Sequence, residues 1–283
     1  MPRWAAFVGL TAAVVALLLV LARLSQRLVS DGDEASAGSR TDGAGRSRPP
    51  GAIGDPRIPR FEPPGRARDH ARARDPPALR ARDAEFTTLY LLVNVALTQG
   101  VFGGILLAGA LLLGVPAAAV GVSDAPLAGE MAGVAVGAGL GIVLWIGNEL
   151  AGALADAAGV GFDESLRELL APDSPGGWAL LLGGVLPTVA LVEEFIFRGA
   201  LIGAVAAGTG VSPWALAVVS ALAFGAAHGA QGRVGVAVTG TLGLALAAAF
   251  VLTGSLLVVV VAHYLVNAVE LTVHEGFGVE RLF

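Results

Sequence analysis

Three charged side chains inside an apolar run are the residues of this sequence best suited to chemistry. Glu193, Glu194 and Arg198 lie between Leu191 and Gly199. In a helix, Glu194 and Arg198 share one face with the acidic residue first, which is the favourable order, whereas Glu193 points roughly 100° away. One carboxylate therefore has a cation at hand and the other does not. Ionisable groups at membrane depth are functional by default, and the alternative is a structural ion pair with a spectator glutamate.

Two histidines in later apolar runs extend this set. Phe224 and His228 are four residues apart, as are His263 and Asn267. A carboxylate and an imidazole from different helices can share a water molecule. A second histidine with an asparagine one turn away offers two hydrogen-bond donors to a developing oxyanion. This set is sufficient to hydrolyse an amide bond without a covalent nucleophile, although a lone intramembrane histidine is more often a satisfied core donor.

The composition indicates an integral membrane protein. Of the 283 residues, 55% are hydrophobic, and the mean hydropathy of +0.73 exceeds that of soluble domains. The absence of cysteine excludes a disulfide framework, a thiolate nucleophile and a cysteine-ligated zinc. The net charge of -5 argues against a nucleic-acid partner.

The chain divides into three parts by composition. Residues 1–24 are predicted as a transmembrane anchor or signal-like segment, and retention is favoured because the apolar run is longer than in a signal peptide. Residues 25–83, rich in arginine, proline and glycine, are predicted as a disordered linker. Residues 84–283 carry all the candidate residues named above. Their apolar stretches predict spans at 88–113, 131–153, 178–206, 213–230, 234–252 and 255–274.

The expected fold class is all-α: a polytopic transmembrane helical bundle of about six core helices plus an N-terminal anchor helix. Small residues recur every fourth position at Gly133, Gly137 and Gly141, and again at Gly225 and Gly229. In lipid this spacing lets helix backbones approach closely. We therefore expect these glycines to lie at tight helix contacts.

Three sequence motifs resemble those of a known family. Glu193-Glu-Phe-Ile-Phe-Arg198, Phe224-Gly-Ala-Ala-His228 and His263-Tyr-Leu-Val-Asn267 look like the EExxxR, FxxxH and HxxxN/D motifs of the CAAX protease and bacteriocin-processing (CPBP) family. These are intramembrane endopeptidases similar to the type 2 CAAX prenyl protease. The resemblance covers roughly residues 86–283 and implies that 84–283 form an intramembrane protease domain.

The resemblance also implies roles for the six motif residues. Glu193 and His228 would activate the attacking water, His263 and Asn267 would stabilise the oxyanion, and Glu194 with Arg198 would hold the site together. The family has been described both as metal-dependent and as glutamate-type, and the motifs do not decide between them. We favour no cofactor, because the three candidate ligands lie on three different spans; a zinc ion held by Glu193, His228 and His263 is the alternative.

We therefore predict an intramembrane endopeptidase, a multi-pass hydrolase of the cell membrane. Its partners would be the lipid bilayer and a membrane-bound protein or peptide, cleaved in CAAX-type or related processing. The alternative is a non-catalytic membrane scaffold or immunity-like protein built on the same bundle.

Other polar residues are less easily interpreted. The zinc-protease helix motif H-E-x-x-H is absent, because His274-Glu275 is followed by Gly-Phe-Gly. Asn148 and Glu149 either support the site or lie at the membrane interface. Glu270 and His274 are expected to mark the end of a helix.

Overall fold

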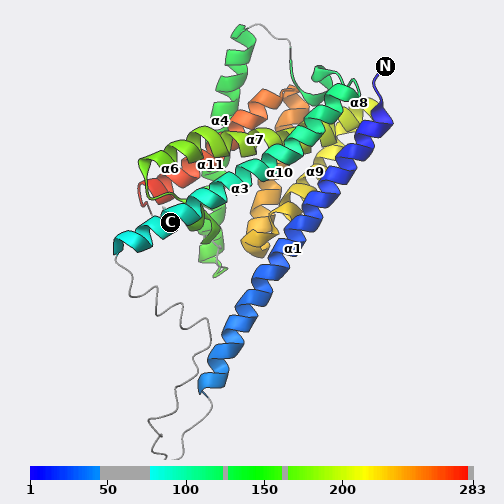
Figure 1. Ribbon diagram of the computed structural model, residues 1–283. Helices are drawn as coiled ribbons and strands as arrows, with labels where there is room; N and C mark the ends of the chain where they lie inside the picture. Colours follow the sequence, from blue (N-terminus) through cyan, green and yellow to red (C-terminus); the bar gives the residue numbers. More distant parts are fainter. Residues whose placement is uncertain (45–76, 124–126, 161–164, 280–283) are drawn as a thin grey trace, which may run out of the picture.

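The computed structural model describes residues 1–44, 77–123, 127–160 and 165–279, and in these ranges all regular structure is helical (Figure 1). The α-helices are α1 (Trp4–Ala44), α3 (Pro77–Leu112), α4 (Leu127–Ala157), α5 (Ser165–Leu170), α6 (Pro175–Leu180), α7 (Leu186–Glu194), α8 (Val205–Thr209), α9 (Pro213–Ala227), α10 (Gly232–Thr253) and α11 (Leu256–Leu271). Short 3₁₀ turns at Ala117–Val120 and Gly229–Gln231, and π-helical segments at Leu181–Val185, Phe195–Ala204 and Thr272–Gly276, connect or extend them.

Six of the described helical stretches are long and apolar enough to cross a membrane. They are Trp4–Leu24, Thr88–Leu112, Gly129–Ala157, Pro175–Thr209, Gly229–Thr253 and Leu256–Gly276. This confirms the predicted all-α polytopic bundle, including its N-terminal apolar helix. The protein is therefore a multi-pass membrane protein.

The predicted span at 213–230 is shorter than expected. Helix α9 contains 15 residues, which corresponds to a rise of about 22 Å against the ~30 Å of a hydrocarbon core. It ends where His228 leaves the helical conformation, with φ -96° and ψ 23°. The His228 ring bonds the carbonyl of Phe224, which satisfies one of the open carbonyls at this helix end. The last two predicted span residues, Gly229 and Ala230, instead form the turn into α10.

One long helical stretch, Pro175–Thr209, departs from α-helical geometry in two π-helical segments. Pro187 has no N–H, and its ring crowds the carbonyl four residues earlier. The π-helical segment Leu181–Val185 ends two residues before Pro187, contains that carbonyl and accommodates the crowding. The second π-helical segment, Phe195–Ala204, begins immediately after the glutamate pair and carries Arg198. The chemically interesting residues therefore lie where the helix departs from regular geometry.

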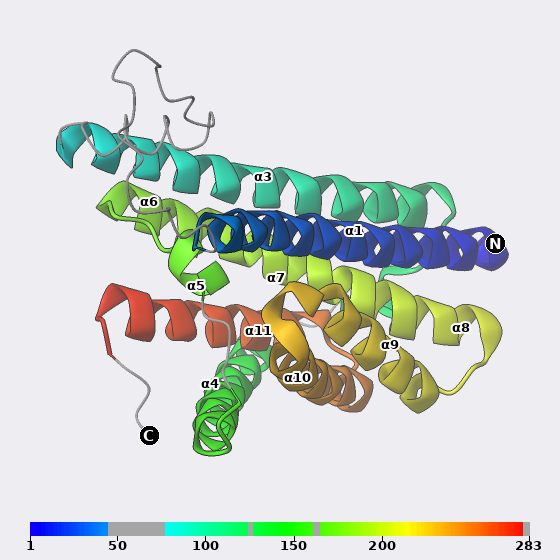
Figure 2. The same ribbon diagram turned by 90° about the horizontal axis from the view of Figure 1, so that it is seen from below.

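Helix α1 packs as part of the bundle. Phe7 and Thr11 are fully buried, and α1 lies beside α3 (Figure 2). Beyond residue 24 the helix continues to Ala44, and α3 begins at Pro77, so helix extends into both ends of the predicted linker 25–83. The physical reason is that a helix already nucleated gains one hydrogen bond for each added residue. Residues 45–76 lie outside the described residues, so the three-part division stays a prediction.

Helices α4 and α11 meet at two of the glycines that the sequence predicted to lie at tight contacts. A β-carbon on Gly137 would lie 2.6 Å from the Val258 carbonyl oxygen, and one on Gly141 would lie 2.9 Å from the Ala262 carbonyl oxygen. Gly225 likewise faces α10, with the Val236 carbonyl oxygen 3.0 Å from such a β-carbon. A β-carbon on Gly133 would lie 3.7 Å or more from its nearest neighbours, which is an ordinary van der Waals distance. Close backbone approach therefore fixes α4 against α11 and α9 against α10.

We expect Gly141→Val to destabilise the protein by roughly 1–3 kcal/mol, because the added atoms must push α4 away from α11. Gly139→Val is the matched control: the same helix carries it, and nothing lies within 4 Å of the added β-carbon. Thermal unfolding of the two purified variants in detergent should show a lower midpoint for Gly141→Val alone. Equal midpoints would contradict the packing described for α4 and α11.

Candidate active site

Glu194 lies at the centre of a buried charge network. Its Oε1 accepts a hydrogen bond of 2.9 Å from Arg198 and one of 2.7 Å from Nδ1 of His263. The side chains of Glu194 and Arg198 are fully buried. Arg198 also donates a 2.9 Å hydrogen bond to the carbonyl of Gly243 in α10. One carboxylate thus connects the Pro175–Thr209 span with α11, and its partner arginine adds α10.

The aromatic ring of Phe224 is packed among the charged groups. The Arg198 guanidinium carbon lies 4.6 Å from its centroid, within the range of a cation–π contact. The His228 ring is 4.6 Å away and the His263 ring 5.9 Å away, centroid to centroid. Phe224 therefore brings both histidines of the predicted set against one ring.

Glu193 has a different environment from its neighbour. Its Oε1 accepts a 2.9 Å hydrogen bond from Nε2 of Gln99 in α3. Its Oε2 is buried, has no hydrogen-bond partner among the described residues, and lies 3.9 Å from Nε2 of His263. That separation is too long for a direct hydrogen bond. One oxygen of Glu193 is therefore held in place, and the other faces an imidazole across a short gap.

The hydrogen bonds of the two histidines determine their available atoms. A carbonyl oxygen can only accept, so Nδ1 of His228 donates its proton to Phe224 over 2.8 Å. Nε2 of His228 makes no hydrogen bond to the described residues. In His263, Nδ1 is occupied by Glu194, and Nε2 is the atom turned toward Glu193. In each ring Nε2 is the atom left for a reactant.

Asn267 lies one turn after His263 on α11 and is half-buried. Its amide makes no hydrogen bond to the described residues. The structure thus brings Glu193, Glu194, Arg198 and His263 into one network and places His228 beside it through Phe224. Asn267 is linked to this network only by its position one helical turn after His263 on α11.

The predicted alternative metal ligands do not converge. In the described part of the chain, the one group of three acidic or histidine ligand atoms lying within 4.8 Å of one another is Glu149, Glu270 and His274. Glu193, His228 and His263 do not meet this criterion. Their donor atoms therefore do not fit a shared metal ion in this arrangement.

Gln99 was missed by the sequence analysis. It is a polar residue within the apolar span Thr88–Leu112. Because a polar side chain is costly to bury in lipid, its presence there was the sequence signal that could have identified it. Its link to Glu193 had no local pattern, because the two residues are 94 positions apart.

The fold and site define a class of protein: a polytopic membrane protein with a glutamate–arginine–histidine network buried between its helices. Residues 175–269, about a third of the chain, match the model of a family described as Type II CAAX prenyl endopeptidase Rce1-like. The matched stretch contains all six predicted site residues. This confirms the resemblance to the CPBP family that the three motifs indicated, and with it the relation to a family of proteases. No curated protein and no solved structure gave a significant match.

We expect Gln99→Leu to reduce turnover roughly tenfold to a hundredfold, because a hydrogen bond to a charged group contributes about 1.5–3 kcal/mol. KM should change little, since Gln99 contacts Glu193 rather than substrate. Thr98→Val, which removes only an exposed bond to Asn94, is the control. Kinetics on a membrane-bound reporter peptide would test this; a loss confined to KM would contradict a positioning role.

Replacing Arg198 by methionine should destabilise the fold by about 3–5 kcal/mol, because it leaves the Glu194 charge buried without its guanidinium. Arg233→Met is the control, as Arg233 is exposed in α10 and such a change costs within about 0.5 kcal/mol. Unfolding midpoints in detergent would measure both. An Arg198→Met protein as stable as the control would show that the pair is not needed for folding.

Proposed function

We propose that this chain is an intramembrane endopeptidase that hydrolyses peptide bonds of membrane-associated polypeptides. The observation that supports it most is Oε2 of Glu193: a buried carboxylate oxygen without a hydrogen-bond partner among the described residues, 3.9 Å from an imidazole nitrogen. A purely structural ion pair accounts for Glu194 and Arg198. It gives no reason for a second glutamate held by Gln99 in this position.

In the proposed reaction, Glu193 is the general base. A water molecule between Glu193 and the histidines loses a proton to Oε2 as its oxygen bonds to the carbonyl carbon of the scissile peptide. Nε2 of His228 can accept a hydrogen bond from the same water, because its Nδ1 carries the proton. When the C–N bond breaks, the proton held by Glu193 passes to the leaving amine. Atoms and charges balance without a covalent intermediate on the protein.

His263 and Asn267 are proposed to stabilise the oxyanion. Nε2 of His263 donates when the ring is an imidazolium, and the Glu194 carboxylate on Nδ1 stabilises that positive charge. Asn267, half-buried one turn away and without another partner among the described residues, would supply the second donor. Arg198 holds Glu194 in place.

The mechanism as proposed requires no metal ion. The ligand atoms of the three residues that would hold zinc do not lie close together. Asn267, one turn after His263, is a poor zinc ligand but a suitable hydrogen-bond donor to an oxyanion. The family description mentions CAAX prenyl substrates. For this chain we propose CAAX-type or related processing at the cell membrane, with or without a prenyl group on the substrate.

The decisive variant is Glu193→Gln, which preserves size and hydrogen bonding but removes the base. We expect at least a thousandfold loss of turnover, with unchanged insertion and unfolding midpoint. Glu168→Gln, an exposed glutamate of α5, is the matched control and should be fully active. Membrane proteomics of a deletion strain carrying each variant would identify an uncleaved precursor that only Glu168→Gln and wild type process.

If Glu193→Gln and His228→Ala both restore every deletion phenotype, the protein acts as a non-catalytic scaffold and the endopeptidase proposal is wrong.

A further inference from the structure

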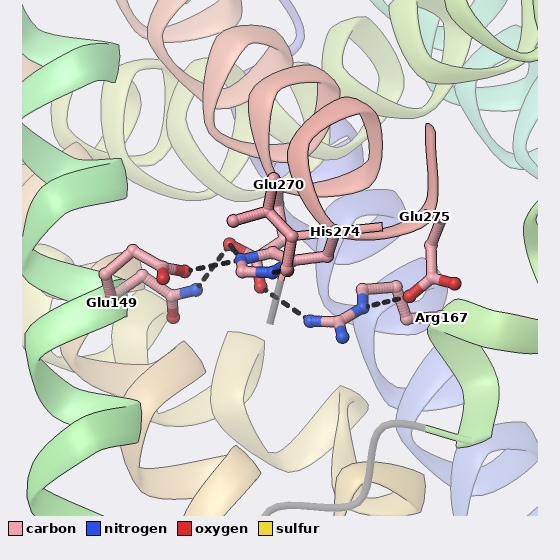
Figure 3. A network of polar contacts seen from close by, with 7 residues as sticks. Glu149, Arg167, Glu270, His274 and Glu275 are labelled. Atoms are coloured by element: carbon pink, nitrogen blue, oxygen red, sulfur yellow. Dashed lines mark hydrogen bonds and ion pairs between the residues drawn. The ribbon is translucent and has the colours of Figure 1, made fainter. Parts of the chain in front are cut away.

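A second polar cluster lies between α4 and the end of α11 (Figure 3). His274 follows His263 by eleven residues, about 16 Å along the helix axis. Glu149 from α4 and Glu270 from α11 face His274, and the ligand atoms of the three residues lie within 4.8 Å of one another. Glu149 and His274 are buried, at 6% and 7% exposure.

The orientation of His274 turns a ring nitrogen toward both carboxylates. Nδ1 lies 2.7 Å from the carbonyl oxygen of Val279. Since a carbonyl only accepts, Nδ1 carries a proton. Nε2 lies 2.9 Å from Oε1 of Glu149 and 3.9 Å from Oε2 of Glu270. In the neutral imidazole three acceptor atoms therefore converge, and either a proton or a cation must lie among them.

Glu270 is positioned by its own hydrogen-bond donors. Asn148 donates to its Oε2 over 3.2 Å, and Arg167 of α5 donates to its Oε1 over 3.1 Å. Arg167 also binds Glu275 at 2.6 Å. Metal-binding carboxylates and imidazoles are oriented by such hydrogen bonds, the carboxylates by donors and the imidazole by a carbonyl oxygen.

The electrostatic setting favours a cation. Among the described residues, three carboxylates, those of Glu149, Glu270 and Glu275, contact one guanidinium, that of Arg167, and the His274 imidazole. The cluster also sits at the C-terminal end of α11, where the helix dipole adds partial negative charge. Neighbouring ligand atoms around tetrahedral zinc are about 3.4 Å apart, between the 2.9 Å and 3.9 Å separations here. Small side-chain shifts would complete the geometry.

We propose that Glu149, Glu270 and His274 bind a divalent metal ion, with zinc favoured by the imidazole and two carboxylates. The ion holds α4 to the end of α11, and with three protein ligands it keeps one position for water. It takes no part in the peptide hydrolysis proposed above.

The test is metal analysis of the full-length protein purified in detergent, incubated with zinc chloride and dialysed. Wild type should retain about one zinc per chain and gain thermal stability that a chelator reverses. Glu149→Gln and His274→Gln should lower the zinc content at least fivefold and abolish the stabilisation. His228→Ala should keep both, because His228 is outside the cluster.

Absence of bound zinc and of any stabilisation in wild type would overturn the proposal, since the cluster would then hold only protons. Zinc lost in His228→Ala but retained in His274→Gln would also overturn it and would place the metal at the proposed active site. Should either cluster variant fail to fold, chelation of folded wild type and of His228→Ala decides: an unchanged unfolding midpoint in both refutes the site.

Discussion

The buried carboxylate of Glu194 is the group on which the rest of the site depends. Transferring an unpaired charge into the helix bundle costs several kcal/mol, so Glu194 requires cationic or donor partners. Arg198 supplies one from the same helix, and His263 supplies another from α11. The guanidinium in turn needs acceptors and finds one in the Gly243 carbonyl. Satisfying one charge thus fixes the relative positions of three spans.

Two adjacent glutamates acquire different tasks because successive helical residues point in different directions. Glu194 points into the bundle and is bound from two sides. Glu193 meets a neutral amide, Gln99, which holds one oxygen and leaves the other facing His263. Because Gln99 is neutral, it holds this carboxylate without adding a cation, which lowers the basicity of Glu193 less than a direct ion pair would.

Departures from regular helix coincide with the site. The π-helical segment Phe195–Ala204 starts after Glu194, and α9 ends at His228. The end of α9 makes His228 a capping residue whose free nitrogen points away from the helix carbonyls. Glycines allow the neighbouring helices to approach closely enough for such side chains to meet. Local irregularity and close packing together create the arrangement of the two histidines around Phe224.

The sequence alone determined features with short-range physical causes. Hydropathy located the apolar spans, and four-residue spacing predicted the Glu194–Arg198 pair. Contacts between distant residues were decided by the tertiary structure: His263 with Glu194 across 69 positions, and Gln99 with Glu193 across 94. Hydrophobic periodicity records which face of a helix is buried, but not which helix covers it. The early end of α9 was also undecided, because Gly229 and Ala230 extend the apolar run two residues past His228, and only the packed chain shows that the turn begins before them.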